Sequence, residues 1–222
     1  MSSNKLIWDE AGKKLYETGV SNCALYPMEN GVYKAGIAWN GVSKISESPS
    51  GAEPSKLYAN NAVYANLMSN EEYGATIEAF MYPDEFAACD GSASIAKGVV
   101  VRQQNRKVFG LAYKTLIGND VDGESHGYTL HLIYGCLAKP SSKDHSTVND
   151  SPEASTMSWE LSTTPVAVTG LKPTATIEID STKVDATRLA ALEKKLFGGI
   201  DTADIPTLPL PDEVATIMTP AG

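Results

Sequence analysis

The sequence KVFGLAYKTLIGNDVDGESHGYTLHLIYGCLA, residues 107–138, carries the strongest structural signal in this chain. Two apolar-rich runs, 107–117 and 127–138, flank a segment of Gly, Asn, Asp and Ser residues at 118–126. Runs of this kind around a cluster of turn formers predict a β-hairpin with a polar tip. Bulky residues occupy both faces of each run, so we expect these strands to lie in the centre of a sandwich or at a subunit interface.

Further strands are predicted on both sides of this hairpin. Alternating apolar residues mark 72–82, and further β-type runs mark 156–168 and 174–180. Two helices interrupt the pattern: a short one at 83–91, and a longer one at 184–197 with Asp185 as its N-cap. The chain is therefore expected to be mainly β, of the α+β type.

Two segments are expected to lack regular structure. Residues 40–70 are small and polar, with scattered Gly and Pro, which is typical of a long functional loop. Residues 205–211 alternate Pro with apolar residues and are expected to be extended. We expect a β domain at 1–174, which includes the N-terminal arm and the 40–70 loop, and a C-terminal extension at 175–222.

Composition excludes several classes of protein. Across 222 residues, 18 basic and 27 acidic side chains give a net charge of −9, and nucleic-acid binding through phosphates needs clustered Lys and Arg instead. The first residues contain no apolar segment of signal-peptide length, and no stretch reaches transmembrane length. The three cysteines, Cys23, Cys89 and Cys136, are expected to be reduced thiols.

Short motifs associated with catalysis or metal binding are present, but the structure predicted around them does not suit those functions. Gly123-Glu-Ser125-His126-Gly127 matches the nucleophile-elbow string, yet that motif requires a strand-to-helix turn and here it falls in a predicted hairpin. The acidic loop from Asn119 to Glu124 lacks the ligand spacing of a calcium loop, and His126, His131 and His145 lack the partners of a zinc site. We expect no catalytic residue, no metal and no cofactor.

A series of short phrases nevertheless follows one order along the chain. They are GIAWNGV (36–42), ESPSGAEP (47–54), LYANN (57–61), YPDEF (82–86), RKVFG (106–110), GYTLHL (127–132), STTPV (162–166) and IDSTK (179–183). This ordered series resembles the major tail tube proteins of siphophages and prophages of Gram-positive bacteria. The resemblance extends from about residue 15 to the Pro-rich end.

The resemblance implies a tail tube β-sandwich or barrel with a short flanking helix and a long inter-ring loop. The helix and Pro-rich tail expected after residue 174 exceed the minimal tube domain of that family, and an outer decoration or a clamp on the neighbouring subunit are both open roles for them. Subunits of that family form hexameric rings that stack into a tube, and DNA only passes through its lumen. The implied partners are other copies of the chain, the tape measure protein, the tail terminator and the distal tail proteins, with no membrane. The implied location is the virion tail, reached from the host cytoplasm during assembly.

The resemblance also suggests which residues meet neighbouring subunits. The 40–70 loop and the arm at 2–20 would make axial contacts between rings. The candidate contact residues are Trp39, Pro49, Gly51, Glu53, Leu57 and Tyr58. Glu78, on the predicted 72–82 strand, is the candidate for an acidic lumen wall.

Two alternatives remain open at this point. The chain could be another virion component, such as a tail terminator, a capsid decoration protein or the tube subunit of a phage-tail-like bacteriocin. From a different class, it could be a serine hydrolase that uses Ser125 with His126 or His131. Electron microscopy separates these alternatives, because only a tube subunit forms tubes.

Overall fold

The predicted hairpin is confirmed and forms the centre of a large antiparallel sheet. Strand β12 (Phe109–Asn119) pairs with β13 (Gly123–Ala138), with Tyr113 opposite His131 and Leu116 opposite Tyr128. Strand β12 has the predicted length but lies two residues further along the chain, and β13 is longer than predicted. Both extend into the turn-rich segment, so the connection between them is short. This hairpin stabilises the fold locally, because its strands are adjacent in sequence and pair over almost their whole length.

The computed structural model describes residues 5–141, 143–145, 147, 154–199 and 204–219. The protein is mainly β: of these described residues, 47% lie in strands and 12% in helices. Strands of the large sheet follow the order β2-β1-β12-β13-β14-β9-β4, with β15 paired to β13 and β3 paired to β1. The remaining strands of this sheet are β1 (Tyr16–Glu29), β2 (Val32–Tyr33), β3 (Ile37–Ala38), β4 (Val42–Glu47), β9 (Gly74–Ala79), β14 (Met157–Thr163) and β15 (Thr176–Asp180).

The sheet curls until β4 lies beside β1, although no hydrogen-bonded ladder joins these two strands. The enclosed face holds the first hydrophobic core. Its centre is Phe86, whose ring contacts those of Trp39, Trp159 and Phe109 at centroid distances of 4.4, 5.3 and 5.4 Å. Phe86 comes from η1 (Asp84–Ala88), which stands where a short helix was predicted but is a 3₁₀ helix.

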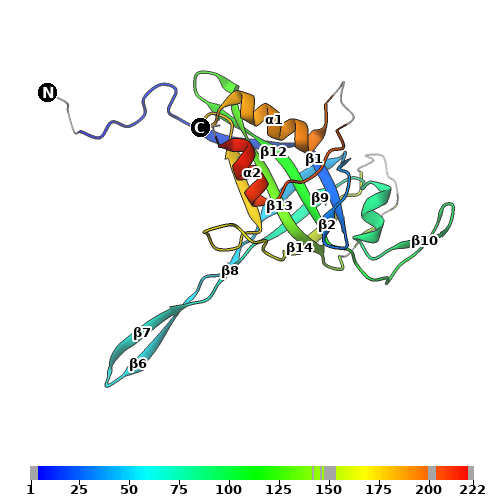
Figure 1. Cartoon of the computed structure of the whole chain (residues 1–222), viewed down its shortest axis with the longest axis horizontal. Coiled ribbons are helices and arrows are strands. Elements are labelled where there is room, and N and C mark those ends of the chain that lie inside the picture. The colour runs from blue at the N-terminus through cyan, green and yellow to red at the C-terminus, as the bar shows by residue number, and fades with distance from the viewer. Residues whose placement is uncertain (1–4, 142, 146, 148–153, 200–203, 220–222) are drawn as a thin grey trace.

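The opposite face of the hairpin is covered by two helices, α1 (Ala186–Phe197) and α2 (Pro211–Met218), as Figure 1 shows. The prediction of α1 is confirmed, including its N-cap: the carboxylate of Asp185 accepts a hydrogen bond from the backbone nitrogen of Arg188 at 3.0 Å. Leu189, Leu192 and Leu196 of α1 pack into a second core with Leu130 and Leu132 of β13. The central strands are therefore apolar on both faces because each face supports its own core.

The segment after residue 174 is integrated with the sheet. Strand β15 pairs with β13, and the phenol of Tyr134 donates a hydrogen bond to the carbonyl of Pro209 at 2.9 Å. The predicted extended tail holds for the residues before Pro211, but there a second helix begins that the sequence analysis missed. Pro211 fits the first turn of a helix, where its missing N–H costs nothing, and Asp212 and Glu213 favour a helix N-terminus.

The prediction of an irregular loop at 40–70 is wrong. Val42–Glu47 form β4, and the rest is a narrow antiparallel ribbon of β5 (Ser50–Gly51) with β8 (Glu71–Glu72) and of β6 (Pro54–Ala59) with β7 (Ala62–Met68). The N-terminal arm is also shorter than expected, since β1 begins at Tyr16. Pairing with strands distant in the sequence ordered β1, β4 and the base of the ribbon, and local composition does not report such pairing. The outer part of the ribbon is instead a local hairpin closed by a two-residue turn. A second small hairpin, β10 (Ala93–Ala96) and β11 (Val99–Val101), was not predicted.

Candidate functional site

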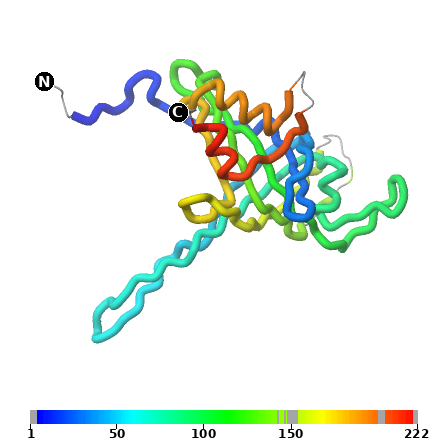
Figure 2. The backbone as a smooth tube through the Cα atoms, in the orientation of Figure 1, coloured from blue at the N-terminus to red at the C-terminus, as the bar shows by residue number. Residues whose placement is uncertain are grey.

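The most distinctive surface of the molecule is the ribbon of residues 50–72, which extends far from the curled sheet (Figure 2). Its tip is a two-residue turn in which Asn60 and Asn61 both have positive φ, 51° and 60°. Such left-handed pairs form the hairpin turns whose twist matches that of the strands, and Asn tolerates this conformation well. At the base, Gly51 has φ of 82°, and a Cβ there would lie 2.3 Å from the carbonyl oxygen of Asn70. The ribbon therefore has a defined geometry at both ends.

The surface of the ribbon is apolar along its length. Lys56 is the one charged residue between Pro54 and Met68. Six large hydrophobic side chains are exposed there, namely Leu57, Tyr58, Val63, Tyr64, Leu67 and Met68, and Tyr64 is the most exposed at 78%. A two-stranded hairpin is marginally stable alone in water, and natural proteins protect exposed strand edges with charges. An exposed apolar hairpin with a single charge between Pro54 and Met68 is typical of a segment that another molecule covers.

The predicted contact residues fall into two groups. Pro49, Gly51, Glu53, Leu57 and Tyr58 all lie on the ribbon or at its base, and all are exposed. Trp39 lies apart from them, because its ring is 3% exposed inside the first core.

Trp39 also donates a hydrogen bond from its indole nitrogen to the carbonyl of Met81 at 2.9 Å. Trp39 therefore has a structural role in the first core. The apolar residues of β7, from Val63 to Met68, were missed by sequence reasoning, although the Asn-Asn pair between two apolar runs was the signal that could have found them.

The candidate lumen residue Glu78 lies on β9, and its side chain is 34% exposed. The ammonium of Lys44, on the paired strand β4, lies 3.5 Å from the carboxylate of Glu78. This partner offsets part of the negative charge at that position.

Two other segments expose apolar side chains. Residues 5–15 precede the first strand and carry Leu6, Ile7, Trp8 and Leu15, each more than half exposed. The β10–β11 hairpin exposes Ile95 and Val100 in the same way. Like the ribbon, the β10–β11 hairpin and the segment before β1 extend away from the large sheet (Figure 1).

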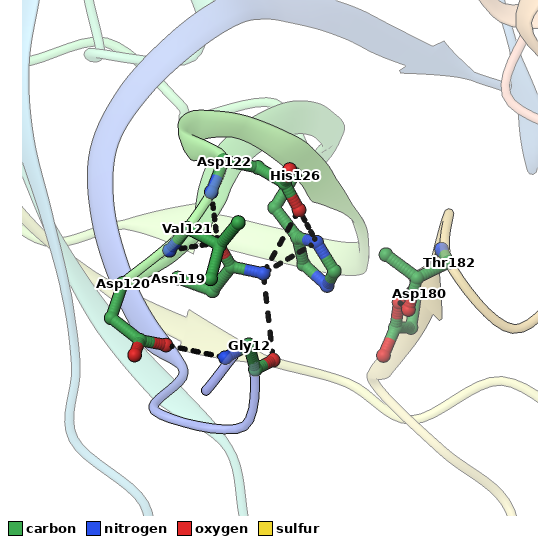
Figure 3. A network of polar contacts seen from close by, with 8 residues as sticks. All are labelled: Gly12, Asn119, Asp120, Val121, Asp122, His126, Asp180 and Thr182. Carbon is green, nitrogen blue, oxygen red and sulfur yellow. Dashed lines mark hydrogen bonds and ion pairs between the residues drawn. The ribbon is translucent and has the colours of Figure 1, made fainter. Parts of the chain in front are cut away.

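The acidic loop considered for calcium is built from hydrogen bonds within the protein (Figure 3). The side-chain oxygen of Asn119 accepts from the backbone nitrogen of Val121 at 2.9 Å, and its amide donates to the carboxylate of Asp122 at 3.0 Å. The carboxylate of Asp120 accepts from the backbone nitrogen of Gly12 at 2.9 Å. These contacts fasten the segment before β1 to the hairpin tip.

Ser125 and His126 are neighbours in β13 and so point to opposite faces of the strand. His126 contacts Asp122 at 3.1 Å, whereas His131 lies further along the strand in a separate polar cluster. Among the described residues no hydrogen bond joins the hydroxyl of Ser125 to either histidine. The Gly-x-Ser-x-Gly string also lies within a strand, not at a strand-to-helix turn, so it lacks the geometry that exposes a nucleophile.

Comparisons with known proteins leave the family open. A scan against models of known protein families finds no match to this chain, and a search of curated proteins finds no match either. Among the described residues, no helix is both long and apolar enough to cross a membrane.

Proposed function

We propose that the protein is the major tube subunit of a long phage tail, a structural protein that assembles into stacked hexameric rings around a DNA-conducting lumen. The observation that carries the proposal is the ribbon of residues 50–72, whose large apolar side chains are exposed in the part of the chain that the structure describes. The ordered phrases that resemble siphophage tail tube proteins support the same conclusion. In this proposal the covering molecule is a second copy of the chain.

A tube requires two kinds of contact between copies. The contact within a ring must close after one turn, whereas the contact between rings must remain open-ended so that the tube can grow. A projecting ribbon suits the second kind, because it reaches beyond its own subunit. The outer strands of the sheet, β4 and β2, suit the first kind, because each leaves backbone groups that a neighbouring subunit can pair with.

The negative net charge suits a conduit for DNA. A basic wall would hold phosphates through counterion release, whereas an acidic wall repels the duplex and lets it slide. The chain carries a net charge of −9, and Glu78 is the proposed contributor to the wall. In the assembled tail the tape measure protein would fill the lumen before DNA, and terminator and distal proteins would close the ends.

Negative-stain electron microscopy of the concentrated, purified protein tests the proposal. We expect tubes of stacked rings from the native chain. A double variant of the ribbon, Tyr64→Ser with Met68→Ser, should give shorter tubes or single rings while its circular dichroism stays unchanged. Val121→Ser provides the matched control, because Val121 is also exposed, at 65%, but lies at the tip of the β12–β13 hairpin.

Hydrogen exchange adds a second measurement on the same samples. An isolated hairpin opens readily, so amides of residues 54–68 should exchange fast in the free subunit and slowly in tubes. A native protein that stays monomeric at high concentration, with no rings or tubes, would contradict the proposal. Closed single rings from the native chain would favour a tail terminator instead.

A further inference from the structure

A polar cluster of four side chains interrupts the enclosed face of the sheet. We call Glu17, Glu47, His131 and Glu178 the carboxylate–histidine cluster; they come from β1, β4, β13 and β15. His131 is directly opposite Glu178 in one ladder and Tyr113 in the other. The cluster lines an open pocket of about 250 Å³, and none of the described residues that line it is Lys or Arg.

His131 is the buried member, with its side chain 8% exposed. The hydroxyl of Thr115 must donate its one hydrogen to the carboxylate of Glu17, because a carboxylate can only accept. The same hydroxyl lies 2.8 Å from Nε2 of His131, so it accepts the hydrogen carried by that nitrogen. This relay assigns the hydrogen of the neutral ring to Nε2 and leaves a lone pair on Nδ1.

Nδ1 of His131 is buried and makes no hydrogen bond. Oε1 of Glu47 lies 3.8 Å from this nitrogen. The lone pair of a buried nitrogen beside a carboxylate meets neither a hydrogen-bond donor nor a positive charge. Such an unpaired polar group costs free energy of folding. A bound cation between the two groups would remove that cost.

The side chains around His131 also favour a bound cation. One ligand atom each from Glu47, His131 and Glu178 lies within 4.8 Å of the other two. The phenol of Tyr113 donates to Oε1 of Glu47 at 2.9 Å and stacks on the ring of His131 at a centroid distance of 4.5 Å. The hydrogen bond from Tyr113 orients the carboxylate of Glu47. Ligands oriented by outer hydrogen bonds are typical of protein metal sites.

We propose that Nδ1 of His131 and the carboxylates of Glu47 and Glu178 bind one divalent transition-metal ion of the zinc type. An imidazole with carboxylates suits zinc, whereas calcium and magnesium take oxygen ligands alone. Bonds of about 2.1 Å place tetrahedral ligands roughly 3.4 Å apart, so the two solvent-facing glutamates need to turn inward by about 1 Å. Water from the open mouth of the pocket completes the coordination.

Such an ion would hold β4 to β13 and β15, and so brace a sheet edge that no ladder closes. This inference does not rest on the proposed function, because it concerns the single chain.

The test is a titration of chelator-treated protein with Zn²⁺ in competition with a chromophoric chelator. We expect one tight equivalent, and no competition from millimolar Mg²⁺ or Ca²⁺. Glu47→Gln and Glu178→Gln should each weaken binding at least about tenfold. Glu124→Gln is the matched control, an exposed glutamate on the same strand as His131, and should bind like the native chain.

NMR of the histidine ring nitrogens identifies the ligand atom. Zinc should shift Nδ1 of His131 and leave His126 unchanged. Thr115→Val should weaken binding and also shift the tautomer signal of His131 before metal is added, which a merely structural role would not do. Absence of a stoichiometric site, equal binding by all variants, or a zinc response at His126 alone would overturn the proposal.

Discussion

The indole nitrogen of Trp159 donates a hydrogen bond to the carboxylate of Asp90 at 3.0 Å. Asp90 is 9% exposed at its side chain, and the guanidinium groups of Arg106 and Arg102 lie 3.6 and 3.5 Å from it. Arg106 also donates to the carbonyl of Ala138 at 3.0 Å. One carboxylate therefore connects the end of the 3₁₀ helix, the segment before β12 and the aromatic core.

We expect Asp90→Ala to lower the free energy of unfolding by about 3 kcal/mol, because it leaves a partly buried guanidinium and an indole N–H without their acceptor. Guanidinium chloride denaturation followed by Trp fluorescence measures the effect. Asp144→Ala, at an exposed position, is the control and should change stability by less than about 0.5 kcal/mol. Equal stability of both variants would mean that Asp90 does not support the core.

The extended segment before α2 offers a comparison of two leucines. Leu208 is 4% exposed and lies directly over Gly110, whereas Leu210 is 50% exposed. Leu208→Ala should cost about 2–4 kcal/mol through lost burial and a residual cavity, and Leu210→Ala less than about 0.5 kcal/mol. Thermal unfolding of the two variants checks this. Similar losses at both positions would show that the segment does not pack as described.

Asp180 predicts a pH dependence of stability. Its carboxylate contacts the ammonium of Lys183 at 2.7 Å and accepts from the hydroxyl of Thr182 at 2.6 Å. Lys183 first, and then Thr182, lower the pKa of Asp180 to about 2. The pKa of Asp180 is lower in the folded state than in the unfolded state. These contacts therefore add their full contribution to the free energy of unfolding above about pH 4, the usual pKa of an unfolded Asp, and the contribution is lost as pH falls to about 2.

The measurement is the difference in unfolding free energy between the native chain and Asp180→Asn. This difference should be on the order of 1 kcal/mol at pH 6, after allowance for solvent screening, and should shrink between pH 4 and pH 2. A difference that stays constant across this range would contradict the assigned contacts.

The three cysteines are free thiols and all are buried, consistent with the expectation of reduced thiols. Burial raises the pKa of Cys23 and that of Cys89 to about 12, and raises the pKa of Cys136 as well. At pH 8 a thiol with a pKa of about 12 is a thiolate in roughly one molecule in ten thousand, and the thiolate is the reactive form. Ellman's reagent should therefore label the native protein slowly and all three thiols after denaturation. Ser125→Cys, at an exposed position, should react within minutes; rapid labelling of the native chain would contradict the buried placement.

Much of the fold follows from local patterns. The 107–138 hairpin, the strand within 72–82 and the helix at 184–197 were all predicted, because each depends on residue periodicity, turn formers and caps within one short segment. The ribbon was missed as a structure because Gly51, Pro54 and the polar residues of the segment indicated a loop, although apolar runs flank Asn60 and Asn61. Its pairing of Ser50 with Glu72 joins positions that local composition does not relate.

The candidate sites divide in the same way. Sequence alone marked the 40–70 segment as unusual and indicated that the Gly-x-Ser-x-Gly string stood in the wrong context, because both judgements need only neighbouring residues. Three features could be seen only in the folded chain. They are the cores on both faces of the hairpin, the burial of Trp39, and the proximity of Glu47, His131 and Glu178. Ladder register sets these neighbours across large separations in sequence, and the free energy that selects the register comes from packing the whole sheet.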